Sequence, residues 1–511
     1  MRATLSSQQS GNPDMNPQPT FSPVSLRYIA ALRGIKPKRT GQGFAYAEAA
    51  CRDPEKLICL AASNPEGRFY GFVADEAMRR SGEEASTQRG TFNIVFLVGT
   101  PSEILARLAN GSSLPPMLDY LCCDESDMPL SATERTALFD IDNKRLNAGG
   151  LFTTSYRAYD RADGALRFLV RNLAPEMNAD QKQEFLAEIK RLGKTYLAQN
   201  SDVMMRLNEA IIKGTPQSFF ALYDDAEATS ATIDTMLAMG TREMAYAGDA
   251  TLTSNYVELA VPVEAQELVV SCRESALYEP IKDLALNRTV RSDIWVKSPV
   301  EHSVDPAELF GGFAYGIMKA RDQIAPTYAA QGKTIDLSAP LYTQLIDLMS
   351  ILPVGVGDVL VHPAGQGVQP EKIIEALQIL VACGIAIPMR GQTGMANNGS
   401  VAQPRLVGNF NRYLDKTDLT DKNVWMASQV MGCGVFLSAR EAFVMQALNR
   451  AGLNNSVSAL MPELRRIAGT DVSMSVIQSN EPTAEMAHGM ICDVIEKSLP
   501  QWYAYALLEA A

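Results

Sequence analysis

The sequence predicts an α/β fold whose first large domain is a parallel, doubly wound sheet. Short apolar runs of strand length alternate with capped helical segments over residues 25–165. Residues 43–73 contain all the parts of one strand–helix–strand unit, the repeat from which such sheets are built. Beyond residue 165 the pattern changes to long helical periodicity and then to shorter mixed elements. Further domains are therefore expected after the first.

Length and composition support several domains and exclude some partners. The chain has 511 residues, 46% of them apolar, which suffices for more than one core. Its formal net charge of −12 disfavours nucleic acid and anionic lipid. No apolar run approaches the roughly 18 residues of a membrane span, and residues 1–24, which lack signal-peptide features, read as a disordered tail.

Cysteine and histidine usage indicates neither disulfides nor a metal. The 8 cysteines include no C-x-x-C pair, and the 3 histidines have no neighbour at ligand spacing. Buried thiols in a reducing cytoplasm are the expectation. A metal at Cys122 and Cys123 with the acids that follow is disfavoured because adjacent cysteines are poorly spaced to share one ion.

The first repeat begins with a buried strand at residues 44–48. Asp53 is suited to cap the following helix, and Pro54 to its first position. A turn at residues 64–67 then leads to a second strand at residues 68–73. The sharp turn after the first strand is where folds of this type bind a nucleotide.

The remaining strands of this domain are expected at residues 91–99, 118–123 and 151–156. Two capping boxes, Thr100 with Glu103 and Ser131 with Glu134, open the intervening helices. The second of these helices is expected to stop at Gly149.

The segment Glu48-Ala-Ala-Cys-Arg-Asp-Pro54 resembles the S-adenosylmethionine motif of class I methyltransferases, usually Glu-Leu-Gly-Cys-Gly-x-Gly. Glu48 and Cys51 match the motif, whereas Ala50, Arg52 and Pro54 replace its glycines. The acid that holds the ribose at the end of the second strand is replaced by Val73. Asp75 could substitute for it, but the position favours a cap of the next helix.

Later segments extend the resemblance, in consistent order, over roughly residues 25–470. They are residues 114–120, 147–156, 218–223, 241–249, 284–296 and 426–437. The chain is similar to bacterial class I methyltransferases that carry a methyltransferase regulatory domain, a family that includes protein-lysine methyltransferases of surface proteins. The resemblance implies a Rossmann-like core at residues 25–165 and a helical, α+β regulatory domain at residues 214–325.

Residues 166–213 read as helical, with an apolar stripe of Phe185, Ile189, Leu192 and Tyr196. The stripe is interpreted either as packing within the chain or as a dimer contact, which the resemblance favours. The regulatory range shows no acid, thiol or histidine cluster at catalytic spacing. Residues 334–511 look like winged-helix units, but no helix there is basic enough for DNA recognition, which favours protein contact.

Candidates on the substrate side are Asp124, Glu125 and Tyr156, at the ends of the fourth and fifth strands. The two acids could contact a cationic amine, although a solvated loop is the favoured interpretation. No catalytic residue is identified.

Two hypotheses follow. The first is a pseudoenzyme that has lost donor binding and acts through protein contacts, as a homodimer or beside an active relative. The second is an active S-adenosylmethionine-dependent protein (lysine) methyltransferase with an altered pocket. The replaced glycines and Val73 favour the first, because each glycine lost adds bulk where the donor needs bare backbone.

Overall fold

The computed structural model describes most of the chain. The described residues are 16–17, 21–36, 43–125, 130–159, 163–223, 231–298, 300–317, 319, 321–331, 333–391, 404–416, 424–451, 492, 494–495 and 498–510. Residues 396–404, which from the sequence are expected to form a loop or linker, lie outside them except for Pro404.

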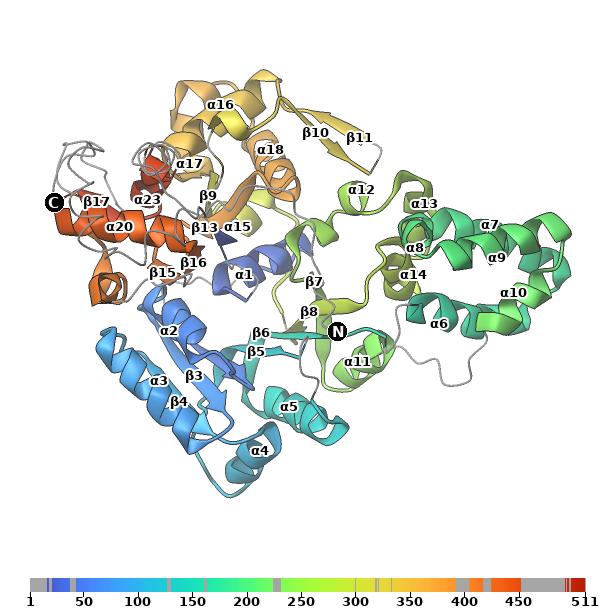
Figure 1. The fold of residues 1–511 in the computed structure, drawn as a ribbon, viewed down its shortest axis with the longest axis horizontal. Coiled ribbons are helices and arrows are strands. Elements are labelled where there is room, and N and C mark those ends of the chain that lie inside the picture. Colours follow the sequence, from blue (N-terminus) through green and yellow to red (C-terminus); the bar gives the residue numbers. More distant parts are fainter. Residues whose placement is uncertain are drawn as a thin grey trace, which may run out of the picture.

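A seven-stranded sheet with the order β4-β3-β2-β5-β6-β8-β7 forms the centre of the protein (Figure 1). Its parallel strands are β2 (Phe44–Ala49), β3 (Gly67–Val73), β4 (Ile94–Val98), β5 (Leu118–Asp124) and β6 (Leu146–Arg157). The other two are β7 (Met244–Asp249) and β8 (Val290–Lys297). Since β8 is antiparallel to both β6 and β7, β7 runs in the direction of the parallel strands. The predicted Rossmann-like α/β fold is confirmed.

Helices cover both faces of the sheet. One face packs against α1 (Pro23–Leu32), α2 (Pro54–Ala62) and α3 (Glu76–Gln88). The other packs against α4 (Pro101–Ala109), α5 (Ala132–Arg145) and α11 (Ala231–Gly240). The strand side chains alternate accordingly, with Tyr46 on the first face and Ala47 on the second.

Local signals placed most helix starts correctly. Asp53 caps α2 with Pro54 at its first position, and Thr100 with Glu103 forms the predicted capping box of α4. The second box is only half formed: Ser131 caps α5, but the Glu134 carboxylate instead accepts from the Ser102 N–H at 2.9 Å. Glu134 therefore ties the start of α5 to the start of α4.

Two predicted boundaries of the core are wrong. β6 begins at Leu146, directly after α5, rather than after Gly149. The predicted tail of residues 1–24 contains ordered structure, because β1 (Asn16–Pro17) pairs with β16 and both Phe21 and Val24 are buried. Packing of α1 across the sheet extends the core toward the N-terminus.

The sheet takes strands from two of the predicted domain ranges. β7 and β8 belong to residues 214–325, yet they pair with β6 of residues 25–165. The same range also contains α12 (Val257–Ala260), α13 (Val263–Ser271), α14 (Tyr278–Ala285) and α15 (Pro306–Phe310), with a 3₁₀ turn at Leu252–Asn255. The predicted strand after Gly240 is confirmed as β7. The core and this range are joined by one continuous sheet.

A helical layer, green at the right of Figure 1, follows β6. It consists of α6 (Gly164–Leu173), α7 (Ala179–Leu192), α8 (Lys194–Gln199), α9 (Ser201–Lys213) and α10 (Pro216–Tyr223). Ile189, Leu192 and Tyr196 are buried within this layer, and Phe185 stacks on Phe220. The stripe packs within the chain, which is the first of the two interpretations, and dimerisation of the protein stays a prediction.

The C-terminal part has two layers. The first contains β9 (Phe313–Ile317), the hairpin β10 (Thr327–Ala330) and β11 (Lys333–Asp336), α16 (Pro340–Ile351), β12 (Val354–Gly355), α17 (Val356–Val361), α18 (Pro370–Ala382) and β13 (Ala386–Arg390). Its antiparallel sheet has the order β12-β9-β13. The layer is thus a succession of helix, short strand, two helices and strand, and the winged-helix-like assignment of residues 334–511 stays a prediction.

The second layer packs around Trp502. It contains β14 (Pro404–Leu406), α19 (Gly408–Arg412), β15 (Val424–Ser428), β16 (Cys433–Leu437), α20 (Ala439–Ala451), α23 (Leu499–Ala504) and β17 (Leu508–Ala510). Strand β15 contacts α2, which brings this layer against the core. Among the helices of the described residues, none has the length and apolarity needed to cross a bilayer.

We expect Ile189→Ala to lower the free energy of unfolding by about 2–5 kcal/mol, because it leaves a cavity in the helical layer. Ile189 is only 1% exposed. The matched control is Met205→Ala on neighbouring α9, where the side chain is 62% exposed and the expected change is within about 0.5 kcal/mol. Chemical denaturation measures both. Equal effects of the two substitutions would contradict the intrachain packing.

Candidate functional site

The carboxyl ends of β2 to β7 and the amino end of β8 share one edge of the sheet, where ligands bind in folds of this type. All the predicted site residues lie along this edge. The motif residues lie at the end of β2, in the turn after it and at the end of β3. Asp124 is the last residue of β5, Glu125 follows it, and Tyr156 is near the end of β6.

The turn after β2 keeps a glycine-like backbone without glycine. Ala50 has a φ of +53°, in the left-handed region that glycine adopts at little cost. The Cys51 N–H donates to the Phe72 carbonyl at 2.7 Å, which fastens the turn to β3. The sequence suggested that the Arg52 side chain adds bulk in the donor pocket. In the structure this side chain is exposed and does not fill the pocket. The replaced glycines therefore altered side chains while the course of the backbone was retained.

The amide groups that begin α2 already have a partner. The Asp53 carboxylate accepts from the Lys56 N–H at 3.1 Å, and Pro54 offers no N–H. An anionic ligand group at this helix start would face the Asp53 carboxylate.

The ribose position at the end of β3 offers no acid. Val73 is completely buried in the apolar core beneath the edge. Asp75 is the N-cap of α3 and accepts from the Met78 N–H at 2.8 Å, which confirms the favoured interpretation of this residue.

Two residues of the motif, Glu48 and Cys51, have raised pKa values. Burial of the carboxylate raises the pKa of Glu48 to about 7, with Lys56 opposing the shift and Asp53 and Asp124 adding to it. Burial also raises the pKa of the Cys51 thiol well above its usual value. A carboxyl group that titrates near neutrality can hold or release a proton at this edge.

Glu125 is part of the protein interior, so the solvated-loop interpretation is wrong for this residue. It is completely buried, and its carboxylate lies 2.7 Å from Nη2 of Arg135 on α5. It also accepts from the Leu130 N–H at 3.0 Å. The cation that Glu125 binds comes from its own chain. Asp124 remains partly exposed at the end of β5.

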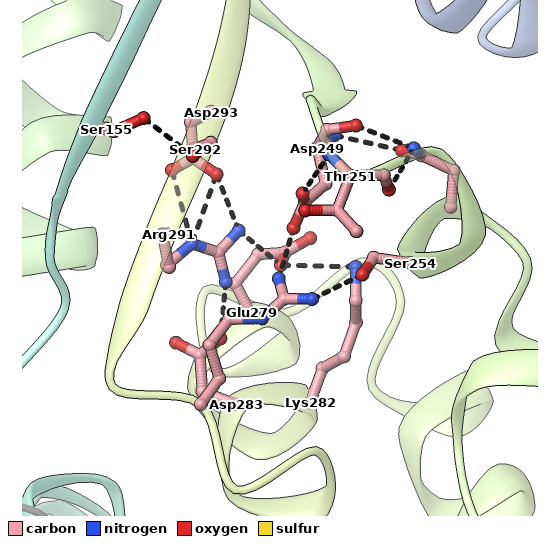
Figure 2. A network of polar contacts seen from close by, with 12 residues as sticks. Ser155, Asp249, Thr251, Ser254, Glu279, Lys282, Asp283, Arg291, Ser292 and Asp293 are labelled. Carbon is pink, nitrogen blue, oxygen red and sulfur yellow. Dashed lines mark hydrogen bonds and ion pairs between the residues drawn. The ribbon is translucent and has the colours of Figure 1, made fainter. Parts of the chain in front are cut away.

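Tyr156 lies in a buried network of charges that sequence reasoning missed. Its hydroxyl donates to Oδ2 of Asp293 on β8 at 2.5 Å. Asp293 in turn contacts the Arg291 guanidinium, which is completely buried (Figure 2). Burial raises the pKa of Tyr156, and the Asp293 carboxylate adds to the shift, so its hydroxyl is a fixed donor.

Arg291 binds three carboxylates. Its Nη1 lies 2.7 Å from Asp283, and its Nη2 lies 2.7 Å from Glu279 and 2.9 Å from Asp293. Glu279 and Asp283 point toward it from α14 (Figure 2). Lys282 of the same helix lies 3.5 Å from Glu279. The network thereby fixes α14 against the end of β8.

A second cation, Arg288, extends the network to β7. It pairs with Asp249 at the end of that strand and donates to the Ser254 hydroxyl. Asp249 also accepts from the Thr251 N–H at 2.8 Å. In the described residues the network thus holds four carboxylates and three cations: Asp249, Glu279, Asp283 and Asp293 with Lys282, Arg288 and Arg291.

Because the four carboxylates of the network outnumber its three cations, one carboxyl group is favoured to retain its proton. Burial raises the pKa of Asp283 to about 6 against the opposing charge of Arg291, and its Oδ2 has no hydrogen-bond partner. For Glu279 burial acts in the same direction, but the charges of Arg291 and Lys282 outweigh it and lower its pKa to about 2. Asp283 therefore titrates much closer to neutrality than Glu279 on the same helix.

The sequence of residues 214–325 showed no cluster of acids, thiols or histidines at catalytic spacing, and this group of acids is assembled only by the fold. The acids come from β7, α14 and β8, so no spacing in the sequence reveals them. Charged residues at alternate positions, Arg291 and Asp293, in a strand that is otherwise buried were the available signal. No cluster of three or more histidine, cysteine or acidic side chains suited to a metal ion occurs in the part of the chain that the structure describes.

The motif residues do not fit S-adenosylmethionine in the usual way. A carboxylate for the ribose hydroxyls is missing at Val73, and Asp75 is already engaged. The Asp53 carboxylate occupies the start of α2. Glu48, Cys51 and the left-handed backbone at Ala50 retain features of the motif.

Comparison with known proteins places these elements. Residues 224–297, which contain the buried network, match a family described as "predicted methyltransferase regulatory domain". A solved structure of PKMT2 from Rickettsia typhi in complex with AdoHcy is similar over 96% of this chain and 98% of that one, at 13% identity and a TM-score of 0.61. A second structure of the same protein matches with 14% identity over 96% and 99%, also at 0.61. No curated protein matches. The chain therefore shares the fold of PKMT2, and its residues 224–297 match the regulatory-domain family.

We expect Asp283→Asn to remove a pH dependence of stability. The Asp283 pKa of about 6 lies above the ordinary value of 3.8, so its contribution is complete below about pH 4 and is lost as the pH rises through 6. This loss amounts to about 3 kcal/mol. The variant should therefore gain stability relative to the wild type between about pH 4 and 7.

Denaturant unfolding at several pH values measures this difference. The matched control is Asp140→Asn on α5, where the carboxylate is exposed and outside the network. If the free energies of unfolding of the wild type and Asp283→Asn differed by a constant amount across this pH range, the raised pKa assigned to Asp283 would be contradicted.

Proposed function

We propose that the protein is a non-catalytic methyltransferase-like protein that acts through contacts with another protein. One observation carries the proposal: the ribose position is a completely buried valine, Val73, and the nearby Asp75 is engaged as a helix cap. A charge-assisted hydrogen bond is typically worth about 1.5–3 kcal/mol. Its loss weakens donor binding by roughly tenfold to a hundredfold.

The turn after β2 supports the same proposal. The donor is held in such sites by close approach to bare backbone. Ala50 and Pro54 add bulk there, whereas the exposed Arg52 does not fill this space. Asp53, which caps α2, adds a negative charge where the carboxylate of a methionine group would approach. Loss of favourable groups and gain of an unfavourable one act together.

A surface of the helical layer supports contact with a partner. On α9, Met205 is 62% exposed and Ile212 is 84% exposed, and between them they border a shallow apolar hollow with Met204 and Leu197. Large apolar side chains grouped on one helix face are typical of protein interfaces. We assign this α9 face to pairing with a second copy or with an active relative, in the reducing cytoplasm in which its free cysteines are stable.

A second candidate function is an active S-adenosylmethionine-dependent protein methyltransferase. It is favoured by the turn at Ala50, which keeps the left-handed backbone, and by Glu48, whose pKa of about 7 suits proton transfer. AdoHcy, the ligand named with PKMT2, is the demethylated form of this donor. If active, the edge residues would accept a substrate beside Asp124 and Tyr156.

Calorimetric titration with S-adenosylmethionine separates the two candidates. We expect no binding tighter than about 100 µM for the wild type. Replacement of Ala50, Arg52 and Pro54 by Gly with Val73→Asp should tighten binding by about tenfold to a hundredfold. The matched control keeps Val73 and changes only the three motif positions. Tight binding by the wild type would overturn the non-catalytic proposal in favour of the active enzyme.

We also expect Met205→Glu with Ile212→Glu to abolish self-association, because paired α9 faces would bury like charges. Sedimentation velocity measures the change. The control pair, Val361→Glu with Ile351→Glu, lies on exposed parts of α17 and α16. Oligomers that persist in the α9 variant would exclude this face as the contact.

A further inference from the structure

A cleft of about 570 Å³ separates the core from the second C-terminal layer. Its core wall is the end of α2 and the connection from α3 to β4, which includes Gly90 and Phe92. Its other wall is formed by Gly408, Asn409 and Gln429. Since Phe92 precedes β4, the cleft lies at the amino edge of the sheet, opposite the edge that carries Glu48. It is a separate place from the donor site.

The cleft has no charged lining residue among those described. The nearest cation, Arg89, is only 9% exposed and is held by Glu55 at 3.0 Å. Its guanidinium also packs over the rings of Phe410 and Tyr413, at 4.8 and 5.0 Å from their centroids. Since no charged side chain of the described residues lines the cleft, these residues offer phosphates, carboxylates and ammonium groups no ion-pair partner there.

The lining offers instead one aromatic face and two amides. The Phe92 side chain is 78% exposed, which is unusual for a phenyl ring. The face of the ring is therefore available for stacking. The side chains of Asn409 and Gln429 are exposed on the opposite wall. Each amide can donate and accept hydrogen bonds at once. These groups match a flat ligand whose edge carries both donors and acceptors.

We propose that this cleft binds an uncharged, planar nitrogen heterocycle of nucleobase size. The ring stacks on Phe92, and its polar edge bonds to Asn409 and Gln429 across the cleft. A volume of about 570 Å³ lies within the range of small-molecule sites. Because the two walls belong to the core and to the C-terminal layer, such a ligand strengthens the contact between them.

The test is a titration of the protein with adenine as a neutral probe, in which binding is monitored by chemical shifts or by calorimetry. Loss of one base–aromatic stacking contact typically weakens affinity by about fivefold to 150-fold. Phe92→Ala should therefore weaken adenine binding by that factor. Asn409→Ala should weaken it too. The matched control, Val361→Ala, removes an 83% exposed apolar side chain on α17 and should leave affinity unchanged.

Charged probes make the test more stringent. Benzamidine and benzoate, which are planar but ionised, should bind at least tenfold more weakly than adenine. Absence of adenine binding up to about 10 mM, or equal affinity in the wild type and Phe92→Ala, would overturn the proposal. Adenine held in the donor site would respond to the changes at Ala50 and Val73 but not to Phe92→Ala. A failure here therefore leaves the proposed function untouched.

Discussion

Arg291 carries the charge on which the arrangement of this chain most depends. It is completely buried, and within the described part of the chain its ion-pair partners are the carboxylates of Glu279, Asp283 and Asp293. Removal of one partner from a buried ion pair typically costs about 3–5 kcal/mol, because an uncompensated charge is left inside. Helix α14 and strand β8 must therefore keep their relative positions for the protein to remain folded.

Through this network the regulatory domain completes the sheet of the core. Strand β8 pairs with β6 along its length, and the bond from Tyr156 to Asp293 crosses the same boundary. Arg288 adds β7 through Asp249. Anything that alters the protonation of Asp283 acts on both parts, since they share one sheet. The regulatory domain is therefore built into the methyltransferase-like core rather than attached to it.

The donor motif shows how a backbone can persist after its ligand groups have changed. Ala50 keeps a left-handed conformation because the Cys51 N–H is held by the Phe72 carbonyl, a contact of the sheet itself. Val73 is retained by the core, which gains from an apolar side chain at that point. Contacts of the sheet thus hold this turn in place without a glycine at position 50.

Much of this could be predicted from the sequence where neighbours in the chain decide the outcome. The caps at Asp53, Asp75 and Thr100 and the parallel strands of the core were predictable, because capping and strand burial depend on adjacent residues. The contacts made by Glu134, by Glu125 and by the stripe at Ile189 could not be predicted in this way. Each depends on residues of another helix or strand that lie nearby only in the folded chain.

By itself the sequence determined the α/β class, the degenerate motif and the helix starts. Only the tertiary structure decided that Glu125 pairs with Arg135 and that acids from β7, α14 and β8 converge on Arg288 and Arg291. The physical reason is distance along the chain. A buried charge must find its partner in space, and long-range pairing of strands decides which residues are near enough to serve.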